Sequence, residues 1–379
     1  MRFSTCLCAS LLIFSQFQLQ GISGQEVTPL FNGKDLSGWV LVNTPPQTWS
    51  VQDGMLVCSG KPIGELRTEK MYHNFELELE WRHMVPGGNA GIFVWADDIT
   101  ARGVPFHRGI EVQVLENAYG NTQSHTTHGD IFPIHGAQMT PINGRGGGSR
   151  AFPTEERSKP SPEWNHYRIV CNDGNISLAV NGKVVTQGKE ASPRKGYICL
   201  ESEGGVVQYR NLRIRELPET PLDAKDVAIS HRGYHSVYTG LDLEGWKVKG
   251  AGKNAWLVKD WVLAFDGSVA GEEARLETAD AIQLRGFVMD FRFTEKSEQL
   301  WLTLPDSVAP IAFAAKGDSQ FATSMEKVGS WNRIEVVAAQ GHVQVTLNGK
   351  PHDLSGTLGN GPILIDPIGP IEVANIYVR

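Results

Sequence analysis

The sequence predicts an all-β fold made of two β-sandwich domains, with the second domain a trimmed and degenerate copy of the first. Short segments of alternating apolar and polar residues, separated by turns rich in Gly, Asn and Asp, fill the chain, and almost none has a helical period. A pattern of tryptophans and turn residues also occurs twice. Sheets with one apolar face are stable when two of them pack together, so both copies should form sandwiches.

The repeat opens with residues 31–39 (FNGKDLSGW) and returns as residues 238–246 (YTGLDLEGW). Trp164 and its following Asn correspond in the same way to Trp331 and its following Asn. The offset between matching tryptophans is 207 residues at the start of the repeat and 167 later, so the second copy is 40 residues shorter in its middle. The missing stretch is therefore the place to search for chemistry that only the first domain performs.

Strict alternation is clearest in residues 75–81 (FELELEW), which places four apolar side chains on one face of a strand and three glutamates on the other. Residues 287–293 (FVMDFRF) are the counterpart in the second copy. Turns such as Asn172-Asp173-Gly174 join further strands into hairpins. These patterns predict antiparallel sheets in both copies.

The domain boundaries follow from the repeat and from proline. Residues 25–217 are expected to form the first domain and 231–379 the second, with a linker at 218–230 that begins with Pro218 and contains Pro221.

Residues 1–24 have the pattern of an export signal. Arg2 provides the positive start, an apolar run extends from Cys6 to about Phe17, and small residues follow. The run is too short to cross a bilayer, and no later segment is apolar enough to do so. The mature chain is therefore expected to be periplasmic or secreted, with no membrane span.

The net charge limits the classes of binding partner, and the number of cysteines bears on whether the chain has disulfides. The formal net charge of −7 gives no electrostatic reason to expect nucleic acid as a partner, whereas neutral polar ligands stay open. Removal of the signal leaves Cys58, Cys171 and Cys199, an odd number that does not indicate a disulfide framework. We expect Cys171 and Cys199 to be small buried hydrophobic residues, with a disulfide between them as the alternative.

The most specific local signal in the first copy is residues 111–116 (EVQVLE). On a regular strand Glu111 and Gln113 share a face and Glu116 lies on the opposite one, but a one-residue bulge would bring Glu116 back to the first face. The alternative is that these are ordinary polar residues on the solvent side of a sheet.

The middle of the first copy resembles the 3-keto-disaccharide hydrolase domain family over about residues 29–216. The motifs that carry the resemblance are residues 31–39, 87–95 (GGNAGIFVW), 109–117 (GIEVQVLEN), 125–131 (HTTHGDI) and 163–165 (EWN). The resemblance implies two-sheet sandwiches of the concanavalin A-like, jelly-roll type and activity on 3-keto glycosides. Residues 111–116 are also similar to the Glu-x-Asp-x-x-Glu strand of laminarinase-type glucanases, in which two carboxylates act as nucleophile and acid/base. Gln113 replaces the middle acid here, which argues against an ordinary retaining mechanism.

A 3-keto sugar allows cleavage by elimination, because the ketone acidifies the hydrogen on C2 and the glycosidic oxygen leaves from C1. Water then adds to the resulting enone. Such a site needs a base, an acid at the leaving oxygen, and a group that stabilises an enolate. We expect Glu111 and Glu116 to supply the acid and the base, and His128 or a divalent metal ion to polarise the ketone.

His125, His128 and Asp130 are the candidate metal ligands, because imidazole and carboxylate suit zinc and similar ions. The alternative is one histidine facing the site and the other facing solvent, since a spacing of three residues does not place two side chains together on a strand.

Four further residues are candidates for binding the carbohydrate. Asn89 lies among glycines that let backbone approach a ligand, and Gln113 shares the face of Glu111. Arg82 would bind sugar hydroxyls if its face is concave, and Trp95 would stack on a sugar ring, although a turn role for Asn89 and a buried position for Trp95 are the alternatives. The Gly-rich stretch 143–150 is expected to be a surface loop, either a lid or a simple insertion.

The leading hypothesis from the sequence is an exported enzyme that cleaves 3-keto disaccharides or other 3-keto glycosides by C2 proton abstraction, elimination and water addition. A non-catalytic carbohydrate-binding protein that uses the same face is the alternative, and an ordinary glucanase is disfavoured by Gln113. The second copy lacks the glutamate pair and the histidines, so we expect it to serve mainly in packing, with weak glycan binding as the alternative.

Overall fold

The computed structural model describes residues 26–145, 147–231, 233–306, 310–317, 320–339, 342–354 and 356–379. The export signal predicted for residues 1–24 lies outside these ranges. No helix within them is long and apolar enough to cross a membrane.

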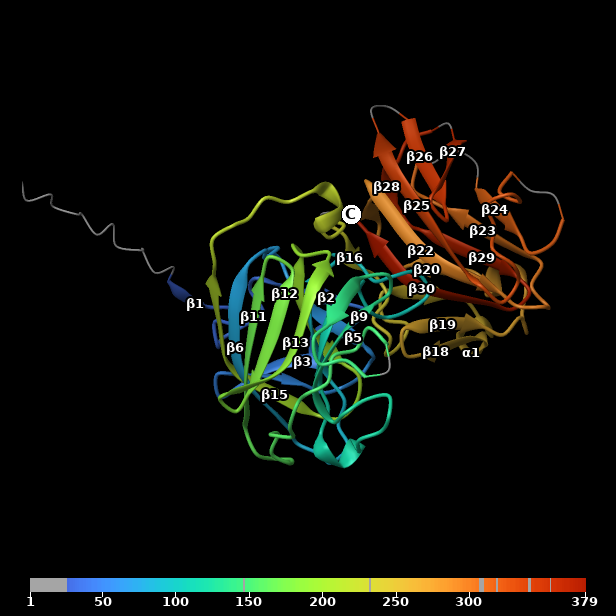
Figure 1. The fold of residues 1–379 in the computed structure, drawn as a ribbon. Coiled ribbons are helices and arrows are strands. Elements are labelled where there is room, and N and C mark those ends of the chain that lie inside the picture. Colours follow the sequence, from blue (N-terminus) through green and yellow to red (C-terminus); the bar gives the residue numbers. More distant parts are fainter. Residues whose placement is uncertain are drawn as a thin grey trace, which may run out of the picture.

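The first sandwich consists of two antiparallel sheets (Figure 1). The larger sheet runs in the order β10 (Gln138–Pro141), β13 (Lys183–Ser192), β12 (Asn175–Val180), β11 (Asn165–Asn172), β6 (Phe75–His83), β15 (Val207–Glu216), β4 (Met55–Cys58) and β3 (Trp49–Gln52), with β1 (Val27–Pro29) paired to β15. The smaller sheet runs β2 (Trp39–Val42), β5 (Gly64–Thr68), β14 (Tyr197–Ser202), β7 (Gly91–Ala96), β8 (Gly109–Val114) and β9 (His128–Ile134). The functional residues discussed below lie on or beside the smaller sheet.

The second sandwich repeats this strand order. Its larger sheet runs β18 (Trp256–Lys259), β19 (Val262–Phe265), β30 (Ile371–Val378), β22 (Gly286–Phe293), β25 (Trp331–Ala339), β26 (His342–Leu347) and β27 (Lys350–Leu354), with β16 (His235–Ser236) paired to β30. Its smaller sheet runs β17 (Trp246–Val248), β20 (Leu276–Thr278), β29 (Leu364–Ile368), β23 (Gln299–Thr303) and β24 (Ile311–Ala314), and β21 (Ile282–Gln283) pairs with β28 (Asn360–Gly361). Strands β18 to β27 in this order match β3, β4, β15, β6, β11, β12 and β13. The predicted all-β fold of two jelly-roll sandwiches is confirmed.

The helices of the described residues are all single turns. They are η1 (Pro46–Thr48), η2 (Asn117–Tyr119), η3 (Ala224–Asp226), α1 (Gly252–Ala255) and η4 (Gly271–Glu273). Element η3 lies within the predicted linker, and the segment is held to the first domain where Ile229 N donates to Asp97 Oδ1 at 2.7 Å. The exact boundaries of the linker stay predictions.

The core of the first domain follows the alternation read from the sequence. Phe75, Leu77, Leu79 and Trp81 of β6 are buried between the sheets. Glu76 and Glu80, on the opposite face, pair with arginines on neighbouring strands, as in the two bonds of 2.7 and 2.8 Å from Arg168 to Glu76. A separate cluster of buried apolar residues fills the second sandwich. Each domain therefore has its own hydrophobic core.

The smaller sheet of the first domain extends one strand beyond that of the second. Strand β24 is the counterpart of β8 and is the last strand of its sheet in the described residues, whereas β9 follows β8 in the first domain. Strands β9 and β10 and the segments around them account for the stretch that the second copy lacks. They also flank the cavity described below.

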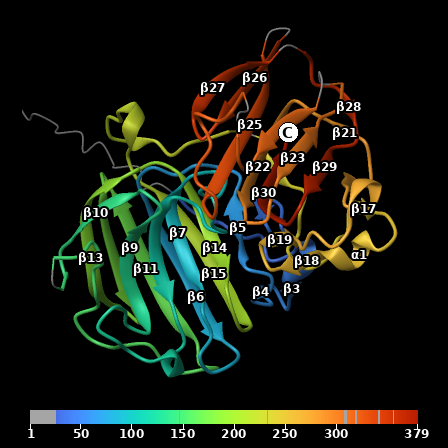
Figure 2. The same cartoon turned by 90° about the vertical axis from the view of Figure 1, so that its right-hand side faces the viewer.

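A loop of residues 97–108, which connects β7 to β8 in the first domain, packs against the second domain (Figure 2). Gly103 N donates to Asp290 Oδ2 at 2.8 Å, and Asn375 Nδ2 donates to Val104 O at 2.9 Å. Thr100 Oγ1 and Tyr377 Oη are 2.8 Å apart. Asp290 and Asn375 are both fully buried. The second domain therefore holds this loop in place through β22 and β30.

Candidate active site

The outer face of the smaller sheet carries the polar residues of the site. Along β14, Ile198 and Leu200 point into the core, so Cys199 and Glu201 point outward. Along β8 the core residues are Ile110, Val112 and Val114, so Glu111 and Gln113 point to the same outer face. Alternation on two strands thus gathers three polar side chains on one surface.

These residues line a cavity of about 320 Å³. Its walls come from β8, β9 and β14 and from neighbouring loops: Asn89, Phe106, Glu111, Gln113, Leu115, Tyr119, His125, Phe132, Ile134, His135, Arg150, Glu201 and Glu203. Three of them are carboxylates, Glu111, Glu201 and Glu203, and we refer to these three as the carboxylate cluster. Concave sites with a few converging polar groups are the usual form of ligand sites.

Gly91 of β7 allows the carboxylate cluster to form. A Cβ atom at this position would lie 2.9 Å from Glu111 Oε1 and 3.0 Å from Glu201 Oε2. Both side chains therefore lie over the bare backbone of the strand between their own strands. The glycine is needed here for close approach, because any larger residue would push the carboxylates away.

Burial keeps the carboxylate cluster partly protonated. Burial, together with the charge of Glu203, raises the pKa of Glu111 to about 8. Burial and the charge of Glu111 raise the pKa of Glu201 well above its ordinary value. The pKa of Glu203 is also raised by burial, although a hydrogen bond from Asn89 opposes the shift. Closely placed carboxylates with different environments can divide the roles of acid and base.

Arg150 is the cation of the cavity. Its Nη1 lies 2.8 Å from Asp130 Oδ2 and 3.3 Å from Gln113 Oε1, and its guanidinium carbon lies 3.4 Å from the centre of the Phe132 ring. Asp130 is fully buried, so its role is to hold Arg150 rather than to contact a ligand. A fixed guanidinium at the edge of the cavity can stabilise a negative charge that develops there.

The structure does not bring Glu116 to the cavity. The one-residue bulge expected between Gln113 and Glu116 does not occur: β8 ends at Val114, before Glu116. The register shift between β8 and β9 instead has its extra residue on β9, since Val112 faces Ile131 and Val114 faces His128. The Glu116 carboxylate instead caps η2, accepting from Gly87 N and Ala118 N at 2.7 Å and from Ser161 N at 2.9 Å. Although burial acts to raise it, these bonds hold the pKa of Glu116 below its ordinary value. We therefore correct the expected acid or base role to a structural one.

His128 also lies away from the cavity. It is buried, with Nδ1 2.7 Å from Ser158 Oγ and Nε2 accepting from Arg157 N at 3.1 Å. These bonds tie β9 to the segment that precedes β11. The structure gives His128 no access to a substrate in the cavity, so the expected polarisation of the ketone by this residue is withdrawn.

The metal ligands expected from the sequence do not converge. His125 lines the cavity but bonds to Thr122 and to Gly120 O, whereas Asp130 bonds to Arg150. Among the described residues, the side chains whose ligand atoms lie within 4.8 Å of one another are Glu65, His107 and Cys199, all buried. The candidate metal ligands in the structure are therefore these three residues, not the three expected from the sequence.

Two of the residues expected to bind carbohydrate lie elsewhere. Arg82 belongs to the larger sheet, where Nε donates to Gln208 Oε1 at 2.9 Å and the guanidinium lies 4.5 Å from the Trp164 ring. Trp95 is fully buried and donates to His73 O at 2.7 Å. Trp95 has φ +54 within a register shift between β7 and β14, so it faces the core instead of the outer surface. The other two, Asn89 and Gln113, line the cavity, and their contact with carbohydrate stays a prediction.

Cys58, Cys171 and Cys199, the cysteines of the described residues, are free and buried. Cys171 lies in the core from β11, and Cys199 lies on the outer face of β14 in the other sheet. The alternative of a disulfide between them is therefore not realised.

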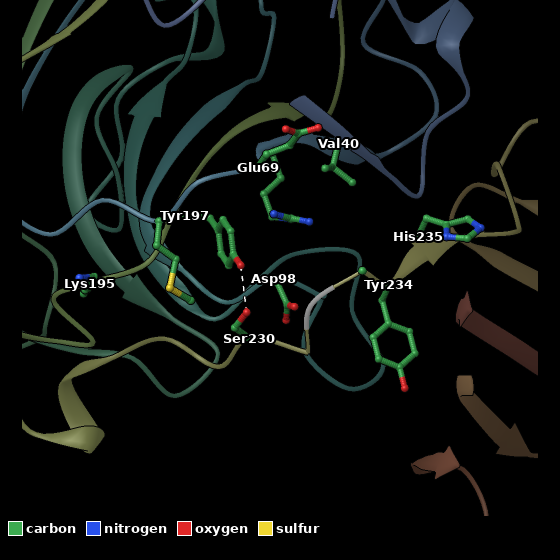
Figure 3. Close-up of a pocket in the computed structure, with 11 residues that line it drawn as sticks. Val40, Glu69, Asp98, Lys195, Tyr197, Ser230, Tyr234 and His235 are labelled. Atoms are coloured by element: carbon green, nitrogen blue, oxygen red, sulfur yellow. Dashed lines mark hydrogen bonds between the residues drawn. The ribbon is translucent and has the colours of Figure 1, made fainter. Parts of the chain in front are cut away.

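A second cavity, of about 620 Å³, lies on the same side of the first domain at its junction with the second (Figure 3). Arg67 lies 4.3 Å from the centre of the Tyr197 ring, and Tyr197 Oη is 3.0 Å from Ser230 Oγ. Asp98 and Tyr234 also line it. The loop of residues 97–108 contributes Asp98 to this cavity and Phe106 to the other, so it lies between the two.

In the described part of the second domain, the carboxylate cluster has no equivalent. Leu66 faces Leu200 in the first domain, and Leu276 faces Ile365 in the second. The positions of Glu65 and Glu201 are therefore taken by Arg275 and Asp366, which form an ion pair at 2.6 Å. Opposite charges in contact neutralise each other there, whereas the first domain places two acids side by side.

Comparisons with known proteins agree with this location. A family model described as a 3-keto-alpha-glucoside-1,2-lyase-like domain matches residues 26–215. A Bacteroides thetaiotaomicron protein named 3-keto-disaccharide hydrolase is 24% identical over 233 residues, which cover 50% of this chain and 77% of that protein. The family match falls on the sandwich that contains the carboxylate cluster.

Several solved structures are similar to this chain. A candidate glycosyl hydrolase from Parabacteroides distasonis matches 51% of this chain and 94% of its own, with 24% identity and a TM-score of 0.39. A β-glucanase from Bacillus licheniformis matches 52% and 100%, with 13% identity and a TM-score of 0.32. A carbohydrate-binding module from Bacillus subtilis matches 47% and 96%, with 10% identity and a TM-score of 0.34.

Proposed function

Because this chain belongs to the 3-keto-alpha-glucoside-1,2-lyase-like family, we propose that it cleaves the glycosidic bond of 3-keto glycosides, 3-keto disaccharides in particular. The name of the Bacteroides thetaiotaomicron relative supports this substrate class. The observation that carries the proposal is the carboxylate cluster over Gly91, with Arg150 at its edge. Export, as residues 1–24 predict, would place the reaction in the periplasm or outside the cell.

Differences in burial indicate which carboxylate of the cluster is the general base and which is the general acid. Glu203 is the only partly exposed member and accepts a hydrogen bond from Asn89, so it ionises most readily and is the general base that takes the C2 proton. Glu111, with a pKa of about 8, is protonated at neutral pH and is the general acid at the leaving oxygen. Arg150 stabilises the negative charge that develops on the ketone oxygen.

The proposed sequence of steps balances in protons. Glu203 removes the C2 proton, the electron pair forms the C1–C2 double bond through the enolate, and the C1–O bond breaks as Glu111 protonates the leaving oxygen. Water then adds at C1 of the enone as Glu111 takes up its proton, and a proton returns to C2 as Glu203 becomes a carboxylate again. The net result is hydrolysis, and release of the enone before water adds would make the same site a lyase.

The substrate test compares a disaccharide with its 3-keto form at equal concentration. We expect release of free sugar from the keto form only, because the parent sugar has no acidic C2 hydrogen. Binding of either sugar without turnover, measured by calorimetry, would support the alternative of a non-catalytic carbohydrate-binding protein. Equal cleavage of both sugars would contradict elimination and favour a direct displacement.

The raised pKa of Glu111 predicts how stability depends on pH. The native state retains a proton that the unfolded chain releases above about pH 4.5, so stability is full below that pH and declines as pH rises toward about 8. Replacing Glu111 by Gln removes this titration and should make the decline shallower. Urea midpoints at intervals from pH 5 to pH 8 provide the measurement, and an unchanged slope in Glu111→Gln would contradict the assignment.

A further inference from the structure

A fully buried group beneath the loop of residues 97–108 has no role in the proposed reaction. Glu65 comes from β5, His107 from the loop and Cys199 from β14, and the accessible surface of each is close to zero. Their ligand atoms, a carboxylate oxygen, an imidazole nitrogen and a sulfur, lie within 4.8 Å of one another. Unpaired polar groups are costly in such a place, so the arrangement requires an explanation.

The hydrogen bonds of His107 fix its tautomer. Nδ1 lies 2.6 Å from Asp97 O, and because a carbonyl oxygen only accepts, Nδ1 carries the proton. In the neutral ring Nε2 therefore presents a lone pair, and it lies 2.8 Å from Glu65 Oε2. Neither of these two buried atoms has a hydrogen-bond partner. Two acceptors at this distance need either a shared proton or a metal ion between them, and the sulfur of Cys199 beside them favours the metal ion.

From this geometry we propose that Glu65, His107 and Cys199 bind one divalent transition-metal ion, with zinc as the best fit to the donors. A bond from the second ring nitrogen to a backbone carbonyl is the usual support of a metal-bound histidine. Thiolate and imidazole favour zinc over magnesium or calcium, which prefer oxygen ligands. The metal also accounts for Cys199, because coordination turns a buried thiol into a thiolate.

The location of this group links it to the cavity. Glu65 faces Glu201 across the β5–β14 pair, and Phe106, next to His107, lines the cavity. Three protein ligands leave a fourth position open, which is the pattern of catalytic rather than closed structural zinc sites. The second domain has Arg275 in the place of Glu65, and its side chain is already paired with Asp366. Metal binding is thus expected in the first domain only, and it does not depend on the proposed reaction.

The test measures metal in the full-length protein. The chain is produced in medium containing zinc, dialysed without chelator and analysed by mass spectrometry of the metal, and a cobalt-loaded sample is examined for a thiolate-to-cobalt charge-transfer band. We expect about one metal ion per chain and a clear band. Cys199→Ser should lose the band and most of the metal. Cys171→Ser, which changes an equally buried cysteine in the core, should keep both.

Glu65→Gln is the second variant, in case Cys199→Ser does not fold, and it should also lose metal because a neutral amide is a poor ligand. A protein that binds neither zinc nor cobalt would overturn the proposal and indicate an imidazolium–carboxylate pair instead. Metal contents that are equal in the wild type, Cys199→Ser and Glu65→Gln would overturn it as well. Activity is not used as a readout, so failure of the proposed function would not affect the result.

Discussion

Replacing Glu203 by Gln is expected to lower kcat on a 3-keto disaccharide by about 10²–10⁴-fold, the usual contribution of a general base. The amide cannot accept the C2 proton, yet its oxygen can still accept the hydrogen bond from Asn89, so the fold should be kept. Glu78→Gln is the matched control, because Glu78 lies on the larger sheet in a partly exposed ion pair with Arg213. Steady-state kinetics and thermal unfolding of both variants provide the comparison.

Substrates with different leaving groups distinguish the general base from the general acid. An aryl 3-keto glycoside has a leaving group that needs no protonation, so Glu111→Gln should lose much less activity on it than on a disaccharide. The loss in Glu203→Gln should be similar on both substrates, because the C2 proton must be removed in either case. If Glu203→Gln lost only activity on the disaccharide, the two roles would be reversed. If neither variant lost activity while both stayed folded, the carboxylate cluster would not be the active site.

Replacing Asp290 by Ala is expected to destabilise the protein by about 3–5 kcal/mol, because it leaves a buried cation without its partner. Asp290 bonds to Arg333 at 2.6 and 2.8 Å and accepts from Gly103 N and Asn375 Nδ2, both at 2.8 Å. Its loss would therefore also remove one of the hydrogen bonds that hold the loop of residues 97–108 to the second domain and loosen the loop. Urea unfolding measures the change in free energy, and limited proteolysis of the loop measures its release.

The first domain contains the natural control for this variant. The strand pairing places Trp81 opposite Asn165 and Phe291 opposite Asn332, so Glu80, rather than the Glu78 that a direct alignment of 75–81 with 287–293 would give, corresponds to Asp290. Glu80 pairs with Arg210 at 2.9 Å, but that pair is partly exposed. Glu80→Ala should cost about 0–1 kcal/mol, as surface ion pairs do. Similar effects of Asp290→Ala and Glu80→Ala would mean that the contact between the domains does not stabilise the protein.

The fold was predictable because its signals are local. Alternation in residues 75–81 and in their counterpart 287–293 gave the strands and their buried faces, and the matching tryptophans gave the duplication. Trp95 shows the limit of this reasoning. A register shift and a positive φ turn its side chain into the core, so simple alternation predicts the wrong face.

The residues of the candidate site were predictable only where they lie together in one strand or next to it. Glu111, Gln113 and Asn89, which line the cavity, could be selected from the sequence because they lie in or beside recognisable strand motifs. Glu201 and Glu203 join Glu111 because β14, β7 and β8 are neighbours in the sheet, a pairing between segments about 90 residues apart that no local pattern shows. Glu116 lies away from the cavity because its carboxylate accepts from three backbone N–H groups in three separate segments, of which only Ala118 N belongs to the single-turn helix η2; no local sequence pattern shows these contacts.

The most direct measurement of the central claim is cleavage of a 3-keto disaccharide in deuterium oxide, with the position of deuterium in the released keto sugar read by NMR. Elimination followed by addition of water predicts one deuteron at C2, in excess of a control without enzyme, and no cleavage of the parent disaccharide. Release of keto sugar that retains its original C2 hydrogen would contradict proton abstraction at C2 and, with it, the proposed mechanism.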